Sequence, residues 1–101
     1  MADKVELLMN IVGTELRRAQ AAHKPMTSAH EGYAVIQEEL DELWKEVKTN
    51  PPDRRKMAVE AIQTAAMAIR LCLDVLLPDG GRNPETNWTL FLARLDEGGE
   101  E

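Results

Sequence analysis

The stretch that most constrains the fold runs from Met57 to Leu77, where apolar residues occupy most positions. It is long enough to cross a bilayer, but it contains the polar or charged residues Glu60, Gln63, Arg70 and Asp74. Charged groups are costly inside a membrane, so a span is disfavoured. A helix that is apolar on nearly every side must be covered all round, and we therefore expect a buried helix.

The length of the chain limits what can cover this helix. With 101 residues the chain forms one domain with a thin core. Few other helices are available as cover, so we expect a homo-oligomer, either a homodimer or a dimer of dimers, in which partner subunits complete the core. Residues 1–97 should form the single domain, and residues 98–101 a flexible tail.

The remaining segments also favour helices, and the predicted fold is an all-α, antiparallel bundle of about four helices. Apolar residues recur at three- and four-residue steps over residues 3–22 and 29–48. Ser28 and Glu31 have the spacing of a capping box, and Pro51 and Pro52 separate the second helix from a third over residues 53–77. A short fourth helix is predicted near residues 84–95.

Charge and cysteine content narrow the function classes. The chain has 12 Lys and Arg against 18 Asp and Glu, a net charge of −6, which argues against binding nucleic acid or anionic membranes through their phosphates. A single cysteine, Cys72, cannot form an intramolecular disulfide, and the first ten residues lack the apolar core of a signal peptide. We expect a cytoplasmic protein.

The second predicted helix carries a dense run of acidic residues. They are Glu38, Glu39, Asp41, Glu42 and Glu46, with Lys45 among them. A solvated helix face is the ordinary explanation of such a run. However, Glu38 and Glu42, and Glu42 and Glu46, are like-charge pairs four residues apart, and each pair destabilises an isolated helix by roughly 0.2–0.5 kcal/mol. Glu39, Glu42 and Glu46 fall within a narrow arc that flanks the apolar stripe.

The third predicted helix brings a matching polar patch. Glu60 and Gln63 lie one turn apart among apolar residues, and a glutamate in such surroundings is costly to bury without a partner. If the two prolines join antiparallel helices, residues whose numbers sum to about 102 lie side by side. Glu42 then faces Glu60, and Glu39 faces Gln63.

Three carboxylates and an amide that converge in this way describe an all-oxygen site for a hard divalent cation. Mg²⁺ fits best, because it prefers oxygen ligands and keeps several waters that a substrate phosphate can replace; Mn²⁺ is a possible substitute. The alternative is that Arg54, Arg55 or Arg70 neutralises Glu60 in an ion-pair network.

These residues resemble a known family. Glu38-Glu39-Leu40-Asp41-Glu42 matches the E-E-x-x-E motif of the MazG-like all-α nucleoside triphosphate pyrophosphohydrolases, in which an E-x-x-D sequence follows on the next helix. Here Glu60-Ala61-Ile62-Gln63 stands in that place, at a separation that fits the family pattern. The resemblance covers residues 28–75, about half of the chain.

The resemblance implies hydrolysis of an NTP or dNTP to the monophosphate and pyrophosphate with Mg²⁺. It also implies that Glu39, Glu42 and Glu60 are metal ligands and that Glu38 binds a second ion or orients the attacking water. Gln63 departs from the family pattern, because an amide oxygen can bind Mg²⁺ but brings no charge. This departure leaves open a non-catalytic module for oligomerisation or nucleotide sensing on the same scaffold.

Three further residues are candidates for substrate binding. Lys56 lies one turn before Glu60 and Arg55 opens the same helix, so both are placed to bind phosphate oxygens, although plain solvation or salt bridging is the more ordinary explanation of each. Asp74 is expected either to contact the base or ribose or to pair with a basic residue of a partner subunit.

Overall fold

The computed structural model describes residues 3–80, 82 and 92–95 and confirms the all-α fold. Helices α1 (Lys4–Ala22), α2 (Ala29–Lys48) and α3 (Arg54–Leu71) are followed by a π-helical turn, η1 (Cys72–Leu76). Residues 92–95 are helical as well, and the described residues include no β-strand. The rest of the predicted fourth helix and the predicted tail lie outside the described residues.

All three helices begin at a side-chain cap, and the one that the sequence predicts, Ser28, is confirmed. Asp3, Ser28 and Asp53 each accept hydrogen bonds from backbone N–H groups of the first helical turn. At α2 the Ser28 Oγ accepts from the N–H of Glu31 at 3.0 Å. The Glu31 carboxylate returns to the N–H of Thr27, at 2.7 Å, so this capping box closes one residue earlier than the standard pattern.

The end of the third helix differs from the sequence prediction. The α-helix stops at Leu71, and the last turn has π-type hydrogen bonding, with the Leu77 N–H donating to the Cys72 carbonyl. The π turn contains Asp74, whose carboxylate accepts from the Met26 N–H at 2.8 Å and lies 3.5 Å from the Arg70 guanidinium. Together, α3 and η1 span nearly the predicted residues 53–77, but the last turn is a π-helix where it contacts the α1–α2 loop.

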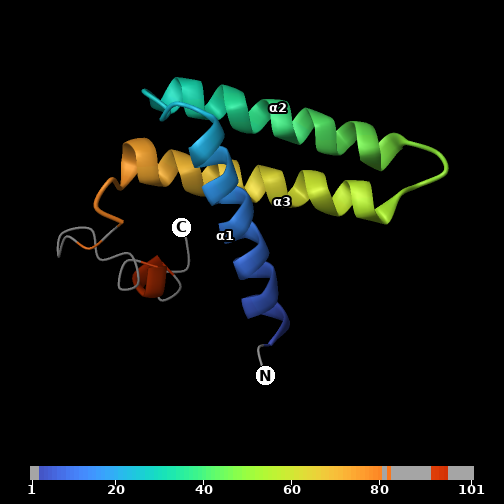
Figure 1. Cartoon of the computed structure of the whole chain (residues 1–101), viewed down its shortest axis with the longest axis horizontal. Helices are drawn as coiled ribbons and strands as arrows, with labels where there is room; N and C mark the ends of the chain where they lie inside the picture. Colours follow the sequence, from blue (N-terminus) through green and yellow to red (C-terminus); the bar gives the residue numbers. More distant parts are fainter. Residues whose placement is uncertain (1–2, 81, 83–91, 96–101) are drawn as a thin grey trace.

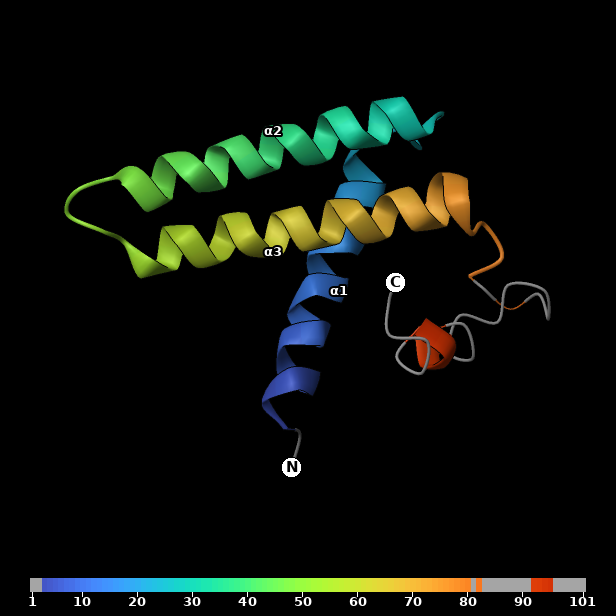
Figure 2. The same cartoon turned by 180° about the vertical axis from the view of Figure 1, so that it is seen from behind.

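Helices α2 and α3 form an antiparallel hairpin, and α1 crosses it (Figures 1 and 2). The C-terminal half of α1 packs against α3, while its N-terminal half extends beyond the hairpin. At the end of the hairpin away from the Pro51–Pro52 turn, Gly32 allows a close approach, because a Cβ at this position would clash with the Leu71 Cδ1. This approach fixes the register in which α2 faces α3.

The buried core of the described residues is small. It consists of Leu16 and Ala19 from α1, Met26 from the α1–α2 loop, and Ala66 and Met67 from α3. Arg70 is also buried, at 5% exposure, and donates to the Lys24 carbonyl while pairing with Asp74. The loop is thus anchored to α3 by polar contacts as well as by Met26.

Many large apolar side chains stay exposed, above all on the N-terminal half of α1. Val5, Leu8 and Met9 are each more than half exposed, and they line an apolar groove of about 490 Å³ together with Val12, Gly13, Ala65 and Ile69. The described residues therefore cover α3 only in part. Among the described residues, no helix is both long and apolar enough to cross a membrane.

Candidate metal centre

Three carboxylates from the hairpin converge at one point. Glu39 and Glu42 on α2 and Glu60 on α3 each offer one oxygen, and these three oxygens lie within 4.8 Å of one another. The antiparallel register inferred from the sequence therefore holds for this pair of helices. Glu39 and Glu42 are one turn apart on α2, and Glu60 reaches them from the opposite helix.

Part of this cluster is buried without a partner. Oε1 of Glu39 and Oε1 of Glu60 are inaccessible to solvent and accept no hydrogen bond. Native structures rarely leave buried polar atoms unpaired, because each costs about 1–3 kcal/mol, and more when it is charged. A positively charged partner at these two oxygens would lower the cost of their burial.

The alternative in which arginine neutralises Glu60 is not the arrangement found. Within the described part of the chain, no ion pair joins a basic side chain to Glu39, Glu42 or Glu60. Arg70, the arginine nearest in sequence on the C-terminal side, pairs with Asp74 instead. Arg54 and Arg55 are exposed at the start of α3.

Proximity and burial change the acidity of the cluster. The pKa of Glu60 is raised, first by burial and then by the negative charge of Glu42. The pKa of Glu39 is raised by burial and by the charges of Glu42, Glu60 and Glu15. Each shift reports a carboxylate that carries its charge at a cost, and a bound cation would remove that cost.

The three oxygens are farther apart than the ligands of one bound Mg²⁺ ion. Two oxygens bound to one Mg²⁺ at about 2.0–2.1 Å lie at most about 4.2 Å apart. The oxygens of Glu39, Glu42 and Glu60 lie within 4.8 Å of one another, so these side chains would have to move closer together to bind one ion.

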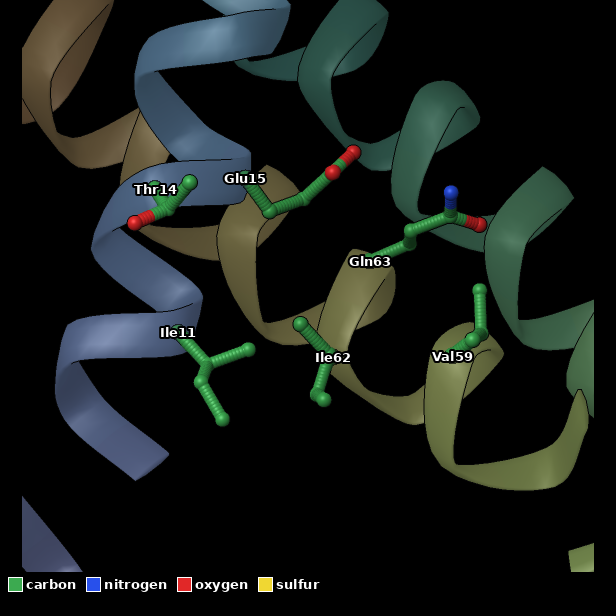
Figure 3. A pocket seen from close by; sticks show the side chains of 6 residues that line it. All are labelled: Ile11, Thr14, Glu15, Val59, Ile62 and Gln63. Carbon is green, nitrogen blue, oxygen red and sulfur yellow. The ribbon is translucent and has the colours of Figure 1, made fainter. Parts of the chain in front are cut away.

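Gln63 lies beside the cluster, at the edge of a cavity of about 290 Å³ between α1 and α3 (Figure 3). Its amide extends toward α2, and the carboxylate of Glu15, on α1, points to the same side. Whether the Gln63 oxygen binds a metal stays a prediction.

Glu15 is the one residue of this region that sequence reasoning missed. Its charge acts on Glu39, and its carboxylate is held by Arg18, with Nε to Oε1 at 2.9 Å. Glu15 lies on α1, outside the acidic run of α2, so its local sequence does not mark it as a neighbour of the cluster. Only the crossing of α1 over α3 brings it near the cluster, and the sequence does not specify that crossing.

Glu38 faces a different cavity. It is exposed, and with Glu39 it lines a space of about 550 Å³ whose opposite wall is the α1–α2 loop. Lys24, Glu31 and Arg70 also border this space. Glu38 is thus adjacent to the carboxylate cluster without being one of its three converging members.

The three predicted substrate-binding residues do not come together in one place, because Asp74 follows the far end of α3 from Arg55 and Lys56. Arg55 and Lys56 are exposed in the first turn of α3, and their backbone N–H groups donate to Asp53. Asp74 has partners within its own chain, Arg70 and the Met26 N–H, and its contact with a substrate or a partner subunit stays a prediction. Its carboxylate therefore serves as an anchor for the α1–α2 loop.

Comparison with known proteins adds no relative. No protein-family model matches the chain, and neither a curated protein nor a solved structure matches it.

Proposed function

We propose that this protein is a Mg²⁺-dependent nucleoside triphosphate pyrophosphohydrolase, which converts an NTP or dNTP to the monophosphate and pyrophosphate. The observation that carries the proposal is the meeting of Glu39, Glu42 and Glu60, with two buried oxygens unpaired. The match of residues 38–42 to the E-E-x-x-E motif of the MazG-like enzymes supports the same conclusion.

In this proposal each residue has a defined task. Glu39, Glu42 and Glu60 hold the ion, and the oxygen of Gln63 is the fourth predicted ligand. The ion supplies positive charge for the triphosphate and acidifies a water molecule. Glu38, next to the cluster and open to solvent, orients that water or accepts its proton. Phosphoryl chemistry of this kind needs positioning and charge and no covalent nucleophile.

The test is incubation with the common NTPs and dNTPs in Mg²⁺, followed by assay of pyrophosphate. We expect release with at least one nucleotide, loss of release in Glu42→Gln, and retention in Asp41→Asn, which removes a charge from the same helix outside the cluster. Nucleotide binding without any product would favour the rival function, a non-catalytic nucleotide sensor. A cytoplasmic location belongs to the proposal, since NTPs and Mg²⁺ are supplied there.

We also propose that a second copy of this chain covers the apolar groove between α1 and α3. The support is the mismatch between a core of five buried apolar residues and a row of large exposed ones on α1. Light scattering should report a dimer or a dimer of dimers, and Leu8→Glu should shift it toward the monomer. A monomeric wild type would refute this part of the proposal.

A further inference from the structure

The cavity between α1 and α3 combines apolar walls with three polar side chains, those of Thr14, Glu15 and Gln63 (Figure 3). The walls are formed by Ile11 on α1 and by Val59 and Ile62 on α3. Glu15 and Gln63 supply a carboxylate and an amide, both directed toward α2. Small-molecule sites share this composition, in which apolar surface gives contact area and a few polar groups give orientation.

We propose that this cavity binds the base of the nucleoside triphosphate whose phosphates are held at the carboxylate cluster, an inference that rests on the proposed function. A base is a flat ring with apolar faces and a hydrogen-bonding edge. The side chains of Ile11, Val59 and Ile62 suit the faces, and the volume of about 290 Å³ is sufficient for one base.

Glu15 and Gln63 have complementary hydrogen-bonding capacity. Glu15 only accepts, and Arg18 fixes its orientation by pairing with both carboxylate oxygens, at 2.9 and 2.5 Å. Further lone pairs of Glu15 stay available to an N–H group of a base. Gln63 offers two N–H donors to a ring nitrogen or carbonyl, a capacity that an aspartate at this position would lack.

Two of the residues that line the cavity flank one member of the carboxylate cluster along α3. Val59 directly precedes Glu60, and Gln63 follows it by one turn. A ligand with its phosphates at Glu60 would therefore have the cavity beside it.

The larger cavity also borders the carboxylate cluster, through Glu39, but it is the less suitable place for a base. Five charged side chains line it and would face a ring there: Lys24, Glu31, Glu38, Glu39 and Arg70. In the smaller cavity the carboxylate of Glu15 and the amide of Gln63 lie on one side. The faces of a ring would contact the aliphatic side chains that line the rest of the cavity.

Equilibrium binding of two ligands separates the cavity from the carboxylate cluster. With Mg²⁺ present, calorimetry compares an α,β-methylene nucleoside triphosphate with inorganic tripolyphosphate, which lacks the base. We expect the wild type to bind the nucleotide at least about tenfold more tightly, because two net hydrogen bonds and buried apolar contact are added. Ile11→Ser and Glu15→Ala should reduce this ratio roughly three- to tenfold.

The matched control is Leu7→Ser, because Leu7 is exposed on α1 to a similar extent as Ile11 and does not line the cavity. It should leave the ratio unchanged. The ratio is insensitive to partial unfolding, which lowers the binding of both ligands equally. Equal affinity of the wild type for the two ligands, or an unchanged ratio in Ile11→Ser and Glu15→Ala, would overturn the base site alone. Failure of both ligands to bind would overturn the proposed function and the base site together.

Discussion

Replacing Glu60 by glutamine should stabilise the metal-free protein and abolish its response to Mg²⁺. The oxygens of Glu39, Glu42 and Glu60 lie within 4.8 Å of one another, so Glu60→Gln removes two like-charge interactions. At this distance each is worth about 0.9 kcal/mol in a water-like dielectric, and more where water is excluded, with salt screening acting in the opposite direction. We therefore expect a gain of about 1–2 kcal/mol in the free energy of unfolding.

Thermal unfolding measures both effects. A gain of 1 kcal/mol raises the Tm of a domain of this size by about 4–8 °C. In the wild type, Mg²⁺ at about one hundred times its Kd should add about 2.7 kcal/mol, whereas Glu60→Gln should show almost no further rise. Asp41→Asn is the control, since it removes a charge from α2 outside the cluster and should keep the Mg²⁺ response. A Glu60→Gln protein that is less stable without metal, or that responds to Mg²⁺ as the wild type does, would refute the reasoning.

Three further predictions concern pH, the loop anchor and Gln63. The pKa values of Glu39 and Glu60 are raised in the folded protein, so the folded state binds more protons than the unfolded chain above the usual glutamate pKa of about 4.3. The free energy of unfolding should therefore fall as the pH rises from about 4.3 through the raised pKa values. Urea unfolding at several pH values in this range should show that the free energy of unfolding falls less steeply with pH in Glu60→Gln than in the wild type. The same dependence on pH in both proteins would contradict the raised pKa of Glu60. Arg70→Met should lower the free energy of unfolding by about 3–5 kcal/mol, because it removes the guanidinium that pairs with the Asp74 carboxylate and donates to the Lys24 carbonyl. If urea unfolding shows a loss below about 1 kcal/mol, the anchor is dispensable. Gln63→Asp should lower the Kd for Mg²⁺ in calorimetry by adding a charge beside the cluster, and weaker binding would mean that the amide makes contacts essential to the site.

The hairpin and its carboxylates were predictable because they depend on local information. Pro51 and Pro52 end one helix and force a turn, and Asp53 caps the next helix, so the register of α2 against α3 follows from residue numbers. That register alone places Glu42 opposite Glu60. The capping of α2 by Ser28 was predictable for the same reason.

The features that escaped prediction depend on packing between distant segments. Glu15 approaches Glu39 only because α1 crosses the hairpin, and no sequence pattern specifies the position of that crossing. The π turn at Cys72–Leu76 accompanies contacts between Asp74 and the Met26 N–H, 48 residues apart. Helical periodicity records only which side of a helix is apolar, so it predicts neither effect.

The central claim is that the carboxylate cluster serves cleavage between the α- and β-phosphates, and the products of the reaction test it most directly. Phosphorus NMR of a nucleoside triphosphate incubated with the protein and Mg²⁺ distinguishes the possible cleavages. The account predicts nucleoside monophosphate and pyrophosphate in equal amounts, with no reaction for Glu42→Gln. Nucleoside diphosphate with inorganic phosphate, or unchanged triphosphate with every nucleotide tried, would contradict it.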